Sequence, residues 1–123
     1  YTNPEIACIG LTEKDFNEIQ EGDFAPSMST DEPFVPYEVH KLPMTFSGRF
    51  VAENEGEMGL CKVIVDKRNK TLIGVHMIGN PCSEFVAAAS FAVRMGYTVA
   101  EFKQVVFPHP TVGEVLREVI MEA

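Results

Sequence analysis

Two apolar runs carry the strongest pattern in this sequence, Leu60-Cys-Lys-Val-Ile-Val65 and Leu72-Ile-Gly-Val-His-Met-Ile78. Both are rich in branched residues, which favour β-strands. The segment between them, Asp66-Lys-Arg-Asn-Lys70, is polar and suited to a turn, so the two runs predict an antiparallel hairpin. Gly74 lies inside the second run, where a missing side chain indicates that another part of the backbone approaches closely.

Shorter elements precede the hairpin. Glu5 to Gly10 is an apolar run that predicts a strand, and Thr12-Glu-Lys-Asp15 has the form of a helix start. Tyr37 to Leu42 alternates as a half-exposed strand does, and a helical turn is expected around Arg49 to Glu53. Residues 20–36 hold repeated Gly, Pro and Ser with four acids and no base, which predicts an irregular acidic loop.

Three helices are expected after the hairpin. The first opens at Asn80-Pro-Cys-Ser-Glu84 and stops at Gly96, and its apolar residues cover so much of the cylinder that we expect it to be mostly buried. Thr98-Val-Ala-Glu101 has the spacing of a capping box, and its helix carries Phe102, Val105 and Val106 as apolar residues. A last capping box, Thr111-Val-Gly-Glu114, starts the terminal helix.

This order of elements predicts an α+β fold, an antiparallel sheet with helices on one side. The chain has 123 residues, which suits a single domain spanning 1–123. Its 18 acidic and 10 basic residues give a net charge of -8, which argues against a nucleic-acid or membrane partner. Cys8, Cys61 and Cys82 form no C-x-x-C pair, so neither zinc nor a disulfide framework is predicted, and a reduced, cytoplasmic setting fits best.

Two of the three histidines are expected to be structural. His40 stands in an alternating strand beside Glu38, which predicts a surface residue. His76 lies in the middle of a strand, where a histidine satisfied by a hydrogen bond is expected. Neither is a candidate for catalysis.

His109 is different because it stands between two prolines in Phe107-Pro-His-Pro110. The prolines restrict the backbone on both sides of it, and a general base needs such rigidity. Glu114 follows in the first turn of the next helix, where it could bond one ring nitrogen, fix the tautomer and make the other nitrogen more basic. The alternative is that Glu114 only caps a helix with Thr111 and that His109 is a turn residue.

A base alone performs no reaction. The sequence has no G-x-G-x-x-G, no Walker loop, no metal-ligand cluster and no nucleophile beside His109. If His109 is catalytic, its cofactor and nucleophile must come from another domain or another chain.

Four segments occur in an order that resembles a known family: Tyr1-Thr-Asn-Pro-Glu-Ile-Ala-Cys-Ile-Gly-Leu-Thr-Glu13, Leu72-Ile-Gly-Val-His-Met-Ile-Gly79, Ser83-Glu-Phe, and His109-Pro-Thr-Val-Gly-Glu114. Together they resemble the C-terminal dimerisation domain of the pyridine nucleotide-disulfide oxidoreductases, most closely that of the dihydrolipoamide dehydrogenases. The resemblance implies that the chain is part of a longer enzyme whose disulfide, FAD and NAD sites lie in domains before Tyr1.

The resemblance also implies roles for residues of this chain. His109 would be the acid/base and Glu114 the carboxylate that orients it, acting in the partner subunit of a homodimer, and the His109–Pro110 bond would be cis. The implied substrate is dihydrolipoamide on a carrier protein of a 2-oxoacid dehydrogenase or glycine cleavage complex. Phe107 stands where dihydrolipoamide dehydrogenases often have another histidine. A glutathione-reductase-like enzyme therefore stays open, as does a non-catalytic interaction module.

Overall fold

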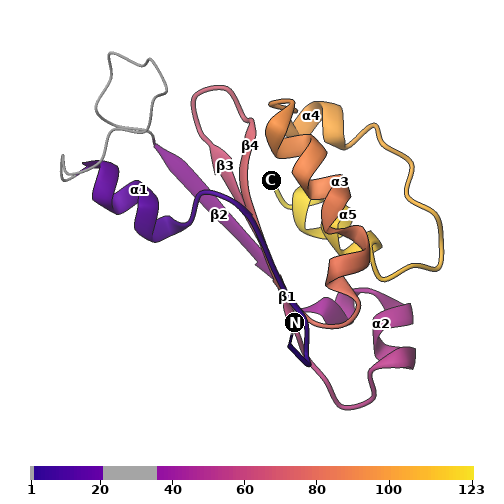
Figure 1. Ribbon diagram of the computed structural model, residues 1–123. Helices are drawn as coiled ribbons and strands as arrows, with labels where there is room; N and C mark the ends of the chain where they lie inside the picture. The colour runs from indigo at the N-terminus through magenta and orange to yellow at the C-terminus, as the bar shows by residue number, and fades with distance from the viewer. Residues whose placement is uncertain (1, 21–35) are drawn as a thin grey trace.

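The computed structural model describes residues 2–20 and 36–123, and a four-stranded antiparallel sheet forms its centre (Figure 1). The strands lie in the order β1-β4-β3-β2. Their bounds are Ile6–Gly10 for β1, Tyr37–Leu42 for β2, Leu60–Asp66 for β3 and Leu72–Ile78 for β4. The predicted hairpin of β3 and β4 is confirmed, with Val63 opposite Val75. The interior of the predicted acidic loop, residues 21–35, lies outside the described residues.

The helices lie on both faces of this sheet, mainly on one (Figure 1). They are α1 (Glu13–Gln20), α2 (Gly48–Glu53), α3 (Cys82–Arg94), α4 (Val99–Phe102) and α5 (Glu114–Met121), with a 3-10 turn at Met44–Phe46 before α2. Helices α3 and α5 pack against the sheet on the same side, and α1 lies on the opposite side. The α+β class with an antiparallel sheet is confirmed.

Alternation along β3 and β4 explains this layering, because successive side chains point to opposite faces. Val63, Val65 and Val75 face α3 and α5 and are fully buried in the main core, together with Leu116 and Val119 of α5. The other face carries polar residues that meet α1. There the ammonium of Lys62 lies 2.9 Å from a carboxylate oxygen of Glu13, and Phe16 stacks on Tyr37.

The predicted close approach at Gly74 is present. The amide of Leu11 donates to the carbonyl of Ile73 at 3.0 Å, and the carbonyl of Leu11 bonds the Nε2 of His76 at 2.9 Å. This carbonyl occupies the place that a Cβ atom on residue 74 would need. The glycine therefore lets the segment after β1 lie flat against β4.

Gly74→Ala is expected to lower the free energy of unfolding by about 1–3 kcal/mol, because the added methyl group forces the backbone of Leu11 away from β4. Gly48→Ala is the matched control, since a Cβ there meets no atom within 4 Å and alanine favours a helix. Chemical denaturation followed by circular dichroism measures both. Equal stability of the two variants would show that the Leu11 contact does not constrain residue 74.

Two expectations about the helices are wrong. Helix α3 is not mostly buried: only Cys82, Ala89 and Ala92 are buried, and Phe91 is 68% exposed. The reason is that the sheet covers one side of α3 and no described element covers the other (Figure 1). Helix α4 does have the Thr98 capping box, but it ends at Phe102 and leaves Val105 and Val106 exposed.

Candidate active site

His109 lies on an exposed turn between α4 and α5, within residues 108–111, which we call the His109 loop. Its Nδ1 lies 2.9 Å from Oε1 and 3.1 Å from Oε2 of Glu114, the first residue of α5. The side chain of His109 is nevertheless 81% exposed. With Nδ1–H donating to the carboxylate, Nε2 is the atom left to take a proton, and no hydrogen bond to it is found within residues 2–20 and 36–123. The His109–Pro110 bond is cis, as the resemblance implies.

Glu114, which bonds the ring of His109, is itself held in place by the backbone of the His109 loop. The backbone N–H of Thr111 donates to Oε2 of Glu114 at 2.9 Å. This bond, followed by the bond from His109, lowers the pKa of Glu114 below its ordinary value of 4.5. The carboxylate is therefore ionised at neutral pH and faces the imidazole as a negative charge.

The expected capping box at Thr111 is only half formed: the carboxylate of Glu114 accepts from the N–H of Thr111, but the hydroxyl of Thr111 caps no helix N–H. The hydroxyl of Thr111 donates to the carbonyl of Pro108 at 2.8 Å, and the residue before α5 is Gly113, which provides no side-chain cap. By contrast, Thr98 and Glu101 form both bonds of a true capping box at α4. The local tie of Thr111 to Pro108 competes with capping and closes the His109 loop on itself. Glu114 thus bonds both the ring of His109 and the backbone of Thr111.

The loop is anchored at its start by Phe107. This ring is partly buried against the core and lies 5.6 Å from the ring of Phe102. Two further residues that the sequence did not single out reach the loop from α2. The hydroxyl of Ser47 donates to the carbonyl of Thr111 at 2.9 Å, and Nη1 of Arg49 donates to the carbonyl of Pro110 at 3.3 Å. Nothing local signals these contacts, since 64 and 61 residues separate the partners.

The other histidines do not join this site. His76 is satisfied by the carbonyl of Leu11, as expected. His40 is not the surface residue that was expected: its side chain is 21% exposed, and its Nε2 is buried 3.4 Å from Glu38. Strand β2 packs against α5 on the face that carries His40, and this packing removes the ring from water.

The cysteines provide no nucleophile for His109. Burial raises the pKa of Cys61 to about 12 and also raises the pKa of Cys82, so both remain thiols at neutral pH. Cys8 is exposed on β1. All three are unpaired. In the described part of the chain, His109 has Glu114 as its hydrogen-bond partner and no serine or cysteine beside it.

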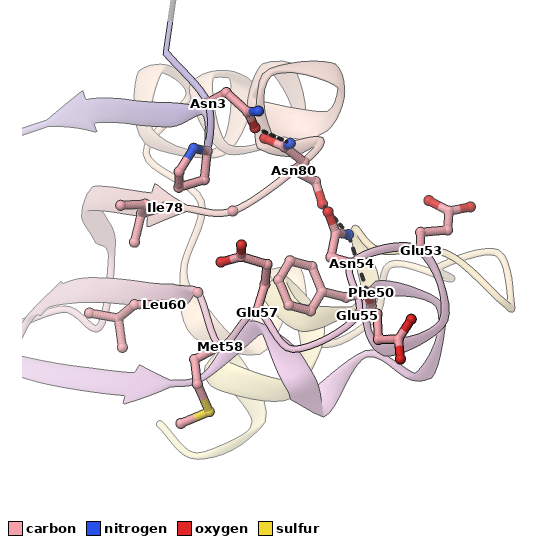
Figure 2. Close-up of a pocket in the computed structure, with 13 residues that line it drawn as sticks. Asn3, Phe50, Glu53, Asn54, Glu55, Glu57, Met58, Leu60, Ile78 and Asn80 are labelled. Atoms are coloured by element: carbon pink, nitrogen blue, oxygen red, sulfur yellow. Dashed lines mark hydrogen bonds between the residues drawn. The ribbon is translucent and has the colours of Figure 1, made fainter.

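A pocket lies away from the His109 loop, at the end of the sheet beside α2 (Figure 2). It has a volume of about 530 Å³. Hydrogen bonds join Asn3 to Asn80 and Asn80 to Asn54 along it, and Glu53, Glu55 and Glu57 add carboxylates to its lining (Figure 2). A lining of this charge, without a Gly-rich phosphate loop, does not fit the pyrophosphate of FAD or NAD.

Among residues 2–20 and 36–123, no group of three or more His, Cys, Asp or Glu side chains is placed to hold a metal ion. None of the helices in those ranges is long and apolar enough to cross a membrane.

The fold and site define a small α+β domain that presents a hydrogen-bonded histidine and carboxylate on its surface. The chain belongs to a known family of this kind: residues 1–120 match the pyridine nucleotide-disulphide oxidoreductase dimerisation domain. This agrees with the resemblance seen in the sequence.

Relatives along the whole chain share one name. The mitochondrial dihydrolipoyl dehydrogenase of Caenorhabditis elegans is 33% identical over 123 residues, which are 100% of this chain and 22% of that protein. The dihydrolipoyl dehydrogenase of Buchnera aphidicola is 34% identical over 114 residues, 93% of this chain and 21% of that protein. The chain therefore spans about a fifth of the length of these relatives.

Solved structures show the same fold. LpdA from Mycobacterium tuberculosis superposes with a TM-score of 0.77 at 22% identity, covering 99% of this chain and 23% of that one. The HOCl-induced flavoprotein disulfide reductase RclA from Escherichia coli, solved with Cu(II), superposes with a TM-score of 0.78 at 19% identity, covering 98% and 24%. At these identities the likeness concerns the fold alone.

Proposed function

We propose that this chain is the dimerisation domain of a dihydrolipoyl dehydrogenase, which converts dihydrolipoamide and NAD to lipoamide and NADH. In this proposal His109 and Glu114 act in the active site of the partner subunit of a homodimer. The observation that carries it is the state of His109, which is oriented by a carboxylate at 2.9 Å and yet is 81% exposed. An oriented histidine that is exposed, with no serine or cysteine beside it among the described residues, is suited to an active site completed by another subunit.

The chemistry assigned to this chain is a proton transfer. Nε2 of His109 takes the proton from one thiol of dihydrolipoamide, and the carboxylate of Glu114 stabilises the imidazolium through Nδ1. The resulting thiolate attacks one sulfur of a redox-active disulfide outside this chain, forming a mixed disulfide and releasing the other sulfur as a thiolate. A base is needed here because the thiolate, and not the thiol, is the nucleophile.

FAD and NAD belong to the proposal as cofactors of the longer enzyme. The pocket beside α2 does not fit either group, since three glutamates line it. No step of the proton transfer depends on a residue of this chain contacting a cofactor.

The homodimer and the carrier protein are also proposals. The family name supports dimerisation. Apolar side chains that the described chain leaves exposed on and after α3 are suited to an interface: Phe91, Met95, Val105 and Val106. The substrate would reach the enzyme as dihydrolipoamide on a carrier protein of a 2-oxoacid dehydrogenase or glycine cleavage complex. A reducing compartment such as the cytoplasm accords with the unpaired cysteines.

A glutathione-reductase-like enzyme is the second candidate. Phe107 supports it, because dihydrolipoamide dehydrogenases often have a histidine at this position. Phe107 is partly buried against Phe102, so it anchors the loop and offers no second acid/base group to a substrate. A non-catalytic interaction module is the third candidate, and the exposed apolar side chains alone would satisfy it.

Substrate assays of the full-length protein distinguish these candidates. We expect NAD reduction by dihydrolipoamide to exceed NADPH oxidation by glutathione disulfide by orders of magnitude in kcat/KM. The reverse preference would establish the glutathione-reductase-like alternative. Activity with neither pair, in protein that is folded and carries flavin, would leave the interaction module.

A further inference from the structure

The backbone that follows His109 is held from outside its own loop. The carbonyls of Pro110 and Thr111, the two residues after His109, each accept a hydrogen bond from α2 or its cap. The donors are Arg49, in the first turn of α2, and Ser47, the residue that caps this helix. Both donors belong to a segment that is remote in sequence, so the folding of the domain brings them to the loop.

Ser47 links the His109 loop to helix α2. It is only 2% exposed, and its hydroxyl both donates to the Thr111 carbonyl at 2.9 Å and accepts from the N–H of Phe50 at 3.2 Å. Phe50 is fully buried in the main core. The hydroxyl therefore couples the His109 loop to the core through the first turn of α2.

Arg49 is fixed from the other side. Its Nε lies 2.6 Å from Oε1 of Glu53, one helical turn away, and its Nη1 reaches the carbonyl of Pro110 at 3.3 Å. The pair with Glu53 orients the guanidinium, so the bond to the loop needs less side-chain ordering than a lone arginine would.

These two bonds matter because apolar packing does not fill the space behind the loop. A hollow of about 380 Å³ is lined by Arg49 and Glu53 of α2 and by Phe107, Pro108 and Thr111. Apolar packing holds the loop at Phe107, and the two hydrogen bonds tie the loop to α2 and its cap beside this hollow.

We propose that Ser47 and Arg49 are positioning residues for His109, holding the main chain of Pro110 and Thr111 so that the imidazole keeps its place beside Glu114. The expected effect on kcat rests on the proposed function. The hydrogen bonds from Ser47 and Arg49 to the loop rest on the geometry alone. Neither residue touches the substrate thiol in this scheme. They act through the loop, and a base that is displaced by a fraction of an ångström transfers a proton more slowly.

The kinetic test uses the full-length protein with Ser47→Ala and Arg49→Gln. Each substitution is expected to lower kcat about tenfold and to leave the KM for dihydrolipoamide unchanged. Arg49→Lys keeps a donor and a charge and should recover part of the loss. In a His109→Gln background neither substitution should lower kcat further, because the group that they position is gone.

Thr98→Ala is the matched control. It removes the hydroxyl that caps α4, as Ser47→Ala removes the cap of α2, but the hydroxyl of Thr98 bonds Glu101 in its own helix and not the His109 loop. We expect lower stability and an unchanged kcat. Arg49→Gln keeps the test decisive if Ser47→Ala does not fold, since Arg49 is half exposed.

If His109→Gln lowers kcat as expected, either of two results would overturn the inference. One is a wild-type kcat in both Ser47→Ala and Arg49→Gln. The other is that each substitution lowers kcat by the same factor with His109 present and in the His109→Gln background. Wild-type turnover in His109→Gln would refute the proposed function instead. In that case the crystal structure of the Arg49→Gln full-length protein decides whether the contact positions the ring. Loss of the Nδ1–Glu114 bond supports positioning, and a distance that stays at 2.9 Å overturns it.

Discussion

His109→Gln in the full-length protein is expected to lower the kcat of dihydrolipoamide oxidation by about 10²- to 10⁴-fold, the usual contribution of a positioned acid/base. Glutamine fills a similar space and keeps an amide donor for Glu114, but it cannot take the proton of a substrate thiol. The loss should therefore fall on kcat. The measurement is steady-state NADH formation, together with the flavin absorbance spectrum to show that the protein is intact.

The matched control for this substitution is His76→Gln. His76 bonds the carbonyl of Leu11 through Nε2, and a glutamine amide can replace that bond. This variant should keep wild-type turnover. Near-normal turnover in His109→Gln itself would rule out the acid/base assignment.

Glu114→Gln is expected to lower kcat about 10- to 100-fold, a smaller loss than that of His109→Gln. The substitution removes the charge that stabilises the imidazolium while the ring itself remains, and a hydrogen bond to a charged group contributes an effect of about this size. Steady-state kinetics measures it. A kcat equal to that of the wild type would show that Glu114 does not act through the histidine.

The pH dependence of stability checks the same carboxylate without an activity assay. Folding lowers the pKa of Glu114 from its ordinary value of 4.5, chiefly through the N–H of Thr111. The ionised group therefore stabilises the folded state above about pH 4.5, and this contribution disappears as the pH falls through the lowered pKa. Wild type should exceed Glu114→Gln in stability at neutral pH, and the difference should vanish in acid. A difference that does not change with pH would contradict the ionised pair.

The strands were predictable because their signals are local. Branched residues in β3 and β4 and a polar turn between them specify a hairpin whatever surrounds it. The capping box of Thr98 and Glu101 was also predictable from the sequence. The same spacing gave only half of a capping box at Thr111, because the hydroxyl of Thr111 donates to the carbonyl of Pro108. A capping pattern states which bonds are possible, and nearby acceptors decide which one forms.

The burial of α3 and His40 was not predictable in this way. Apolar residues all around α3 suggested a buried helix, yet the sheet covers only one side of it. His40 looked exposed beside Glu38, yet α5 covers its face of β2. Burial depends on which elements pack together, and the sequence of one strand or helix does not show which elements will cover it.

The candidate site likewise has a part that the sequence predicted and a part that depends on tertiary packing. By itself the sequence determined the pair of His109 and Glu114, since five residues and two prolines confine both to one turn. It also determined the class of fold through the order of its strands and helices, the hairpin among them. Only the tertiary structure decided that Ser47 and Arg49 hold the loop, because contacts across 64 and 61 residues exist only after α2 has packed beside it. The physical reason is range: backbone restriction and turn chemistry act between near neighbours, whereas a hydrogen bond between distant segments forms only where the packed core places its donor and acceptor.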